Sequence, residues 1–183
     1  IEEVTEAQRH DIKTVNFGIM YGRQAPAIAK QLGCSVETAQ FYIDSFFKLA
    51  PKYAEWYRLQ QKNALTLGRS TTPFGRVRRW NLITRENRQN VLNQAVNFPV
   101  QSTASDLNLT AAIKLNEWFK ETGWGHVLFL VHDSICYEIR EGKEKIVTDK
   151  VRQVITEWPF PSKAVLDVDT KVGPTWGDVE KYR

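Results

Sequence analysis

Two cations and two aromatic rings recur at every fourth residue near the start of the chain. They are Arg9, Lys13, Phe17 and Tyr21, within the stretch RHDIKTVNFGIMYG. On an α-helix this spacing places the four side chains in one slanting stripe. Cations one turn apart repel each other unless an anion lies between them, and a triphosphate is such an anion. The alternative is a solvated basic turn that runs into a pair of core aromatic rings.

Two glycines, Gly18 and Gly22, lie in the same segment. Each glycine costs a helix roughly 1 kcal/mol relative to alanine. Glycine also permits close approach of another group to the backbone. We therefore expect something to approach the backbone closely at these two positions.

A second group of polar side chains surrounds Pro99 in the stretch NQAVNFPVQSTASDL. Asn97 and Gln101 carry amides on either side of this proline, which we expect to interrupt the helix predicted for residues 85–121. Most amides in such positions are surface or capping groups. Asp106 falls inside the helical pattern, so we interpret it as structural.

A third candidate is the dipeptide His132-Asp133, which follows the apolar run VLFLV. The run has the length and composition of a buried strand. A turn at the tip of such a strand can aim the Asp133 carboxylate into a cleft, although a His-Asp turn taken alone is most often structural.

A cluster of arginines in GRVRRW, including Arg76 and Arg78, is either a solvated basic face or a contact for nucleic-acid phosphates. Phosphate contacts of this kind are salt-dependent and independent of base sequence. The net charge of +4 and the isoelectric point of about 9.1 are compatible with a polyanionic partner but are weak evidence alone.

The elements that carry these residues predict an α+β fold. Helices are expected from the capping box Thr5-x-x-Gln8 to about Tyr21, from Ser35 to Ala50, and from Pro51 to near Gly68. A hairpin is expected at 70–80, a strand, turn and strand at 126–139, a helix at 143–158, and an edge strand at 164–173.

The composition bounds the class of protein. The chain has 183 residues, a mean hydropathy of −0.42, and no apolar run of the roughly 20 residues that a membrane span needs. Two distant cysteines, Cys34 and Cys136, favour packing roles in a reducing compartment over a disulfide or zinc site. The start is acidic and lacks both methionine and a signal peptide, so we expect a processed chain or a piece of a longer one.

Three segments resemble motifs of the family A DNA polymerases, and they follow one another along the chain in the same order as in the family. R-x3-K-x3-F-G-x2-YG is similar to their nucleotide-binding helix, N-x-P-x-Q to the segment beside the primer end, and VHD to their catalytic turn. The resemblance extends from about Glu2 to Lys181. The chain departs from the family pattern at four positions, namely His10, Asn93, Ser102 and Ser134.

The resemblance implies roles at the nucleotide. Arg9 and Lys13 are expected to grip the triphosphate of an incoming dNTP and to support catalysis. Phe17 is expected to pack against the sugar and base, and Tyr21 to close the pocket beside the templating base. The two glycines would let nucleotide and template come close.

The resemblance also implies roles at the primer–template DNA. Asn97 and Gln101 would touch the minor groove, where every base pair presents an acceptor at purine N3 or pyrimidine O2. The arginines Arg76 and Arg78 would contact phosphates, and His132 would approach the primer strand.

Asp133 is expected to be a catalytic metal ligand for two Mg²⁺ ions, with Mn²⁺ as a possible substitute. The family's other essential aspartate lies upstream of the nucleotide-binding helix, so the chain is expected to hold half of the metal site. The implied partners are therefore dNTPs, primer–template DNA and the N-terminal remainder of the polymerase, with no membrane.

By resemblance, residues 1–69 would be fingers helices, and residues 70–183 the C-terminal half of an antiparallel-sheet palm. The implied activity is template-directed addition of deoxynucleoside monophosphates to a primer 3′ end. The alternatives are a non-catalytic DNA- or nucleotide-binding remnant and, less favoured, an RNA-templated or RNA-making enzyme. The expected location is the cytoplasm of a bacterium or a virus-infected cell, with an organellar matrix left open.

Overall fold

The computed structural model describes residues 4–182, which divide into two compact units at the boundary between Ser102 and Thr103. A single long helix, α5 (Arg88–Thr122), contributes its first part to one unit and its second part to the other.

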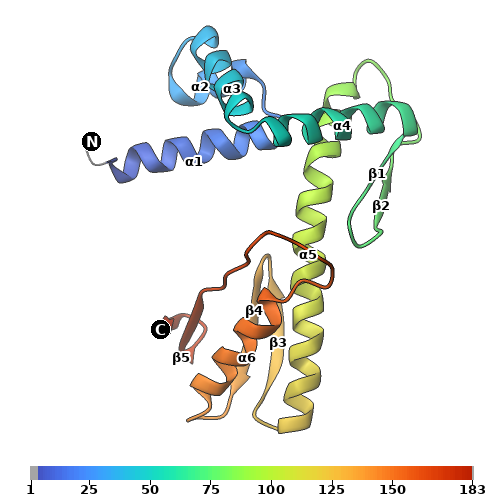
Figure 1. The fold of residues 1–183 in the computed structure, drawn as a ribbon. Helices are drawn as coiled ribbons and strands as arrows, with labels where there is room; N and C mark the ends of the chain where they lie inside the picture. The colour runs from blue at the N-terminus through green and yellow to red at the C-terminus, as the bar shows by residue number, and fades with distance from the viewer. Residues whose placement is uncertain (1–3, 183) are drawn as a thin grey trace. The chain divides into compact units, whose positions relative to one another are not determined.

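The first unit is helical apart from one short hairpin (Figure 1). Its elements before α5 are α1 (Glu6–Met20), α2 (Ala25–Leu32), α3 (Val36–Leu49), α4 (Pro51–Leu67), β1 (Arg69–Thr71) and β2 (Val77–Arg79). The antiparallel pairing of β1 with β2 confirms the predicted hairpin.

The helix ends of this unit follow the predicted signals. The Gln8 amide donates to Thr5 Oγ1 at 3.2 Å and the Thr5 amide donates to Gln8 Oε1 at 2.9 Å, which completes the capping box. Ser35 Oγ caps α3, and Pro51 opens α4. Gly68 ends α4 in the left-handed conformation that glycine adopts without strain.

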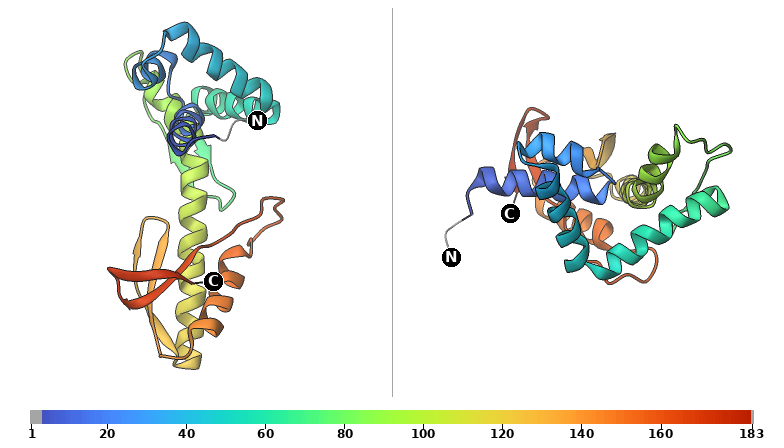
Figure 2. Two further views of the ribbon diagram at one scale, coloured as in Figure 1. Left: turned by 90° about the vertical axis from the view of Figure 1, so that its left-hand side faces the viewer. Right: turned by 90° about the horizontal axis from the view of Figure 1, so that it is seen from above.

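The core of the first unit fixes which face of α1 is exposed. Val15 and Ile19 are buried against α2 and α3 together with Ile28 and Ala39. The views from the side and from above show α2 and α3 packed over the C-terminal part of α1 (Figure 2). Burial of one face leaves the stripe of polar and aromatic residues on the other.

The second unit combines helices with two further hairpins. After the second part of α5 come β3 (Gly125–Val131), β4 (Ser134–Ile139), α6 (Glu144–Thr156), β5 (Thr170–Thr175) and β6 (Asp178–Tyr182). Each hairpin is antiparallel. Its core lies between α5, α6 and one face of the β3–β4 hairpin, centred on Leu115, Phe119 and Val147. The mixed helical and antiparallel architecture confirms the α+β prediction.

Three predictions about elements were wrong. Pro99 lies inside a continuous α5, because a proline removes one hydrogen bond without forcing the remaining turns to unwind. In the run VLFLV, Val127 packs on the core, but Leu128, Phe129, Leu130 and Val131 are 37–48% exposed. Residues 164–169 are not strand, and β5 begins only at Thr170.

Among the described residues, no helix is both long enough and apolar enough to cross a membrane. Cys34 and Cys136 are free thiols, and Cys34 packs against the core of the first unit, as expected for packing residues.

Candidate functional site

The four residues of the predicted stripe do share one face of α1 and its end. The Nζ of Lys13 lies 5.9 Å from the centroid of the Phe17 ring, within the range of a cation–π contact. The rings of Phe17 and Tyr21 are 6.0 Å apart and tilted by 36°. Lys13, Phe17 and Tyr21 therefore form a connected row, and the exposed Arg9 lies one helical turn before Lys13.

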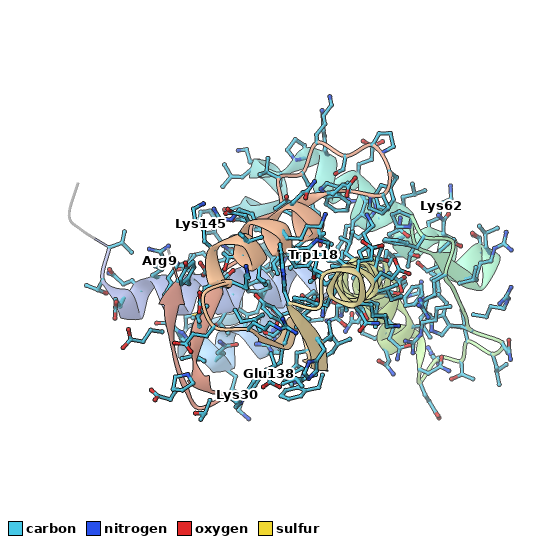
Figure 3. All side chains as sticks on the ribbon, turned by 90° about the horizontal axis from the view of Figure 1, so that it is seen from below. Arg9, Lys30, Lys62, Trp118, Glu138 and Lys145 are labelled. Carbon is cyan, nitrogen blue, oxygen red and sulfur yellow. The ribbon has the colours of Figure 1, made fainter. Side chains whose placement is uncertain are left out.

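The same face carries an open concavity. It is lined by Arg9, Ile12, Lys13, Asn16, Phe17 and Met20. The Phe17 side chain is 43% exposed although it is a large aromatic group, and Ile12 is 55% exposed. Arg9 projects from α1 and Lys30 from α2 (Figure 3). The exposed apolar surface of Ile12 and Phe17 lies beside the two cations Arg9 and Lys13. Such a surface suits a ligand that has both an anionic and an apolar part.

The C-terminal end of α1 is held by side chains from other elements. The Tyr53 hydroxyl donates to the Met20 carbonyl at 3.0 Å, and Asn97 Nδ2 donates to the Tyr21 carbonyl at 3.4 Å. Gln24 Nε2 donates to the next carbonyl, that of Gly22, at 3.0 Å. The last carbonyls of a helix have no intrahelical amide partner, so Tyr53 and Asn97 satisfy groups that α1 leaves open, while Gln24 satisfies a carbonyl just beyond the helix.

Gly22 is approached closely, as the sequence predicted, but by the chain itself. Its φ is +80°, and a Cβ built there would lie 2.5 Å from Asn93 Oδ1 and 3.2 Å from the Tyr57 hydroxyl. At Gly18, a Cβ would lie 3.3 Å from the Cδ of Arg23. Packing of α4 and α5 against the end of α1 therefore accounts for Gly22 without a nucleotide or template.

The two predicted minor-groove amides lie one turn apart on α5. Gln101 is exposed, whereas Asn97 is half-buried because its amide nitrogen reaches the end of α1. Within the described part of the chain, Asn97 Oδ1 is buried without a hydrogen-bond partner. Asn97 thus connects the helix that bears Gln101 to the helix that bears the stripe.

The predicted phosphate contacts lie on the β1–β2 hairpin. Arg78 donates through Nη2 to Gln94 Oε1 at 2.8 Å, and the Trp80 indole donates to the same oxygen at 3.0 Å. The Arg78 guanidinium also lies 5.9 Å from the Trp80 ring. The backbone amide of Arg76 donates to Thr72 Oγ1 at 3.1 Å in the turn of the hairpin.

In the second unit, His132 and Asp133 form the two-residue turn between β3 and β4. His132 has a φ of +53°, a conformation uncommon for a residue other than glycine. Asn108 Nδ2 reaches the His132 carbonyl at 3.5 Å. Both turn side chains are exposed, so the turn presents a carboxylate and an imidazole outward.

The donors fit a hard divalent cation only in part. Asp133 offers carboxylate oxygens, the ligand type that Mg²⁺ prefers. Across residues 4–182, however, the structure holds no cluster of three or more histidine, cysteine, aspartate or glutamate side chains that could bind a metal. Among the described residues, Asp133 is thus a single exposed carboxylate at this turn, and Asp106 is buried within α5.

Comparison with known families decides the assignment. The model of DNA polymerase family A matches residues 1–178. The chain belongs to DNA polymerase family A. Its resemblance to this family is thus confirmed over nearly its whole length.

Relatives of this family A chain come from bacteria and a phage. It is 34% identical to the thermostable DNA polymerase I of Thermus filiformis, with 94% of this chain and 21% of that protein covered. It is 31% identical to DNA polymerase I of Pseudomonas aeruginosa, with 97% and 20% covered. The DNA polymerase of Bacillus phage SP01 is 27% identical, with 97% and 21% covered.

A solved structure agrees. The polymerase domain of Pol1 from M. smegmatis, in complex with DNA primer–template and dNTP, matches with a TM-score of 0.79 and 28% identity. The match covers 85% of this chain and 28% of that chain. The family A chain thus spans about one fifth of the length of the polymerases from Thermus filiformis, Pseudomonas aeruginosa and Bacillus phage SP01.

Sequence reasoning missed the side chains that hold the end of α1, chiefly Tyr53, Tyr57 and Gln24. Tyr53 and Tyr57 are one turn apart on α4, which indicated only a shared face. Asn93 was noticed solely as a departure from the family pattern. No local signal connected Tyr53 to a helix more than thirty positions earlier, and Gln24, only four positions after α1, showed no distinguishing pattern.

Replacement of Gly22 by alanine tests this packing, with Gly33→Ala as the matched control. Gly33 has a φ of +63° and no neighbour within 4 Å of a built Cβ. Its replacement should cost about 1–2 kcal/mol of unfolding free energy from the left-handed backbone alone. Gly22→Ala should cost about 1–3 kcal/mol more, because Asn93 and Tyr57 must move. Equal losses in urea unfolding would show that the contacts at Gly22 are unimportant.

Proposed function

We propose that this chain is the nucleotide-binding and C-terminal catalytic part of a DNA polymerase that adds deoxynucleoside monophosphates to a primer 3′ end. In this assignment, residues 1–69 provide fingers helices and residues 70–183 a palm segment. The observation that carries the proposal is the stripe on α1, in which exposed cations lead into an aromatic pair beside an open concavity.

The stripe suits a dNTP because its two halves match the two halves of that ligand. Arg9 and Lys13 carry charges that bind and orient a triphosphate. Phe17 and Tyr21 offer ring faces for the sugar and base. Phosphoryl transfer depends mainly on positioning and on stabilisation of developing charge, which are the contributions that such side chains make.

Asp133 is proposed as one ligand of a pair of Mg²⁺ ions, with Mn²⁺ as a substitute. Such ions, when bound, activate the primer hydroxyl and neutralise charge on the leaving pyrophosphate. The exposed carboxylate at a strand-connecting turn supports this role, and His132 at the same turn is proposed to face the primer strand. The remaining carboxylate would come from the N-terminal remainder of the polymerase.

The exposed apolar surface of β3 supports the proposal that an N-terminal segment of the polymerase packs against this chain. Leu128, Phe129, Leu130 and Val131 are each more than one-third exposed. A chain that leaves four consecutive apolar strand residues open exposes surface that usually marks an interface. We propose that the N-terminal remainder covers it.

Contacts to primer–template DNA are proposed for Asn97 and Gln101 in the minor groove and for Arg76 and Arg78 at phosphates. The solved relative from M. smegmatis is in complex with DNA primer–template and dNTP, which supports both ligands. The bacterial and phage relatives support action in the cytoplasm of a bacterium or of an infected cell.

The second candidate is a nucleotide- or DNA-binding remnant without catalysis. It is favoured by one observation, namely that only Asp133 is available as a metal ligand at the turn. The two candidates differ in primer extension and agree in nucleotide binding.

Charge removal in the stripe tests nucleotide binding. Arg9→Ala and Lys13→Ala should each weaken dATP binding by about 10- to 100-fold, since a hydrogen bond between charged groups carries about 1.5–3 kcal/mol. Lys30→Ala removes an exposed cation from α2 and should leave the affinity unchanged. Calorimetric titration measures all three, and equal affinities would reject the stripe as a triphosphate site.

Primer extension tests catalysis. On a labelled hairpin primer–template, Mg²⁺-dependent extension is expected when the chain is combined with a separately produced N-terminal segment of the polymerase. Asp133→Asn should lower the rate by about 10³-fold or more, because charge stabilisation by a metal is worth several kcal/mol. The surface control Asp44→Asn should retain the rate. Absence of extension both by the chain alone and by the combination would favour the binding remnant.

Placement of Phe17 against the sugar predicts a change in sugar selectivity. Phe17→Tyr adds a hydroxyl beside the sugar and should relax discrimination against 3′-deoxy nucleotides by about 10-fold, the effect of one hydrogen bond. The ratio of incorporation of dideoxy to deoxy nucleotides measures this in the combined system. An unchanged ratio would contradict the placement of Phe17.

A further inference from the structure

We propose that Tyr53 is a positioning residue for nucleotide selection: its hydroxyl holds the Met20 carbonyl and thereby fixes Tyr21 at the end of α1. The inference rests on the proposed function, because it assigns a consequence for dNTP binding. It adds a residue outside the three sequence motifs, on a helix to which the sequence assigned no chemistry.

The hydrogen bond joins two elements far apart in sequence. Tyr53 lies in the first turns of α4, and its hydroxyl is 3.0 Å from the carbonyl of Met20, the last residue of α1. That carbonyl belongs to the peptide that connects Met20 to Tyr21. Displacement of this peptide would therefore move the Tyr21 ring relative to Phe17, which it faces at 6.0 Å.

Packing holds the Tyr53 ring in place. It stacks on Phe47 at 6.3 Å with an interplanar angle of 9°, and it meets Phe46 edge-on at 5.9 Å. Trp56 and Tyr57 lie 5.5 Å and 6.2 Å away on the same helix. A ring fixed by four aromatic neighbours can hold its hydroxyl in one place, so the bond transmits the position of α4 to α1.

The chemistry of the hydroxyl suits a permanent donor. Burial, with added contributions from Tyr57 and Tyr21, raises the pKa of Tyr53 to about 12. The phenol is therefore neutral and able to donate at physiological pH.

Met20 connects this bond to the ligand face. Met20 lines the concavity together with Arg9 and Lys13, and its carbonyl accepts from Tyr53. Loss of the bond should affect the sugar and base half of the site, where Tyr21 lies. The triphosphate half should be spared, because Arg9 lies about three turns earlier on the helix.

Met20 is the single methionine of the chain, which allows a direct test. In the protein labelled with carbonyl-¹³C methionine and freed of any initiator methionine, Met20 gives the only labelled signal. Tyr53→Phe keeps the ring, removes the hydroxyl, and should move this signal upfield. Tyr42→Phe, at a tyrosine 40% exposed on α3, should leave it unmoved. An unmoved signal in Tyr53→Phe would overturn the proposal.

Ligand binding separates positioning from a general loss of structure. Tyr53→Phe should weaken Mg²⁺–dATP by about 2- to 10-fold, the range of one ordinary hydrogen bond. Binding of inorganic tripolyphosphate should not change. Equal weakening of both ligands, or of neither, would contradict the positioning role. If the unsubstituted chain binds no dATP while the carbonyl signal still moves, the proposed function fails and the positioning role fails with it, although the bond is real.

Discussion

The structure of the first unit depends on which groups donate hydrogen bonds to the backbone carbonyls at the C-terminal end of α1. A helix leaves its last carbonyls without amide partners, and three consecutive carbonyls here accept from the side chains of Tyr53, Asn97 and Gln24. Two of these donors come from α4 and α5. The bonds tie the helix that bears the stripe to the helices behind it, and Gly22 permits the close packing that they require.

This constraint has a functional meaning in a polymerase of family A. Tyr21 lies at the point where the helix ends, so the groups that hold this end also determine where its ring lies. Asn97 combines two contacts, because it is proposed to touch the minor groove and it also donates to the Tyr21 carbonyl. A single amide therefore connects α5, proposed to face the DNA, with the end of α1, proposed to face the nucleotide, and its buried Oδ1 lacks a partner within the described residues.

Local signals were sufficient for several helix ends of the first unit and for the stripe. The capping box at Thr5, the proline at 51 and the glycine at 68 place helix ends because each acts on its own backbone. Periodicity placed Arg9, Lys13 and Phe17 on one face for the same reason. Pro99 was misjudged, since tertiary packing along α5 outweighs the loss of one helical hydrogen bond.

The contacts that position the site were beyond local reasoning. Tyr53 meets Met20 across thirty-three residues, and the exposure of Leu128 to Val131 depends on tertiary packing rather than on the composition of β3. For the same reason, the sequence predicted a close approach at Gly22 but not that Asn93 and Tyr57 make it. Roles implied by the resemblance, such as that of Asp133, concern ligands and remain predictions.

The central claim is that the face of α1 between Arg9 and Met20 binds a deoxynucleoside triphosphate. With a ¹³C-methyl label on the single methionine, Met20 reports directly on this concavity. The account predicts that its signal shifts saturably with Mg²⁺–dATP and far less with deoxyadenosine, which lacks the phosphates that Arg9 and Lys13 bind. No shift with dATP, or the same shift with the nucleoside, would contradict it.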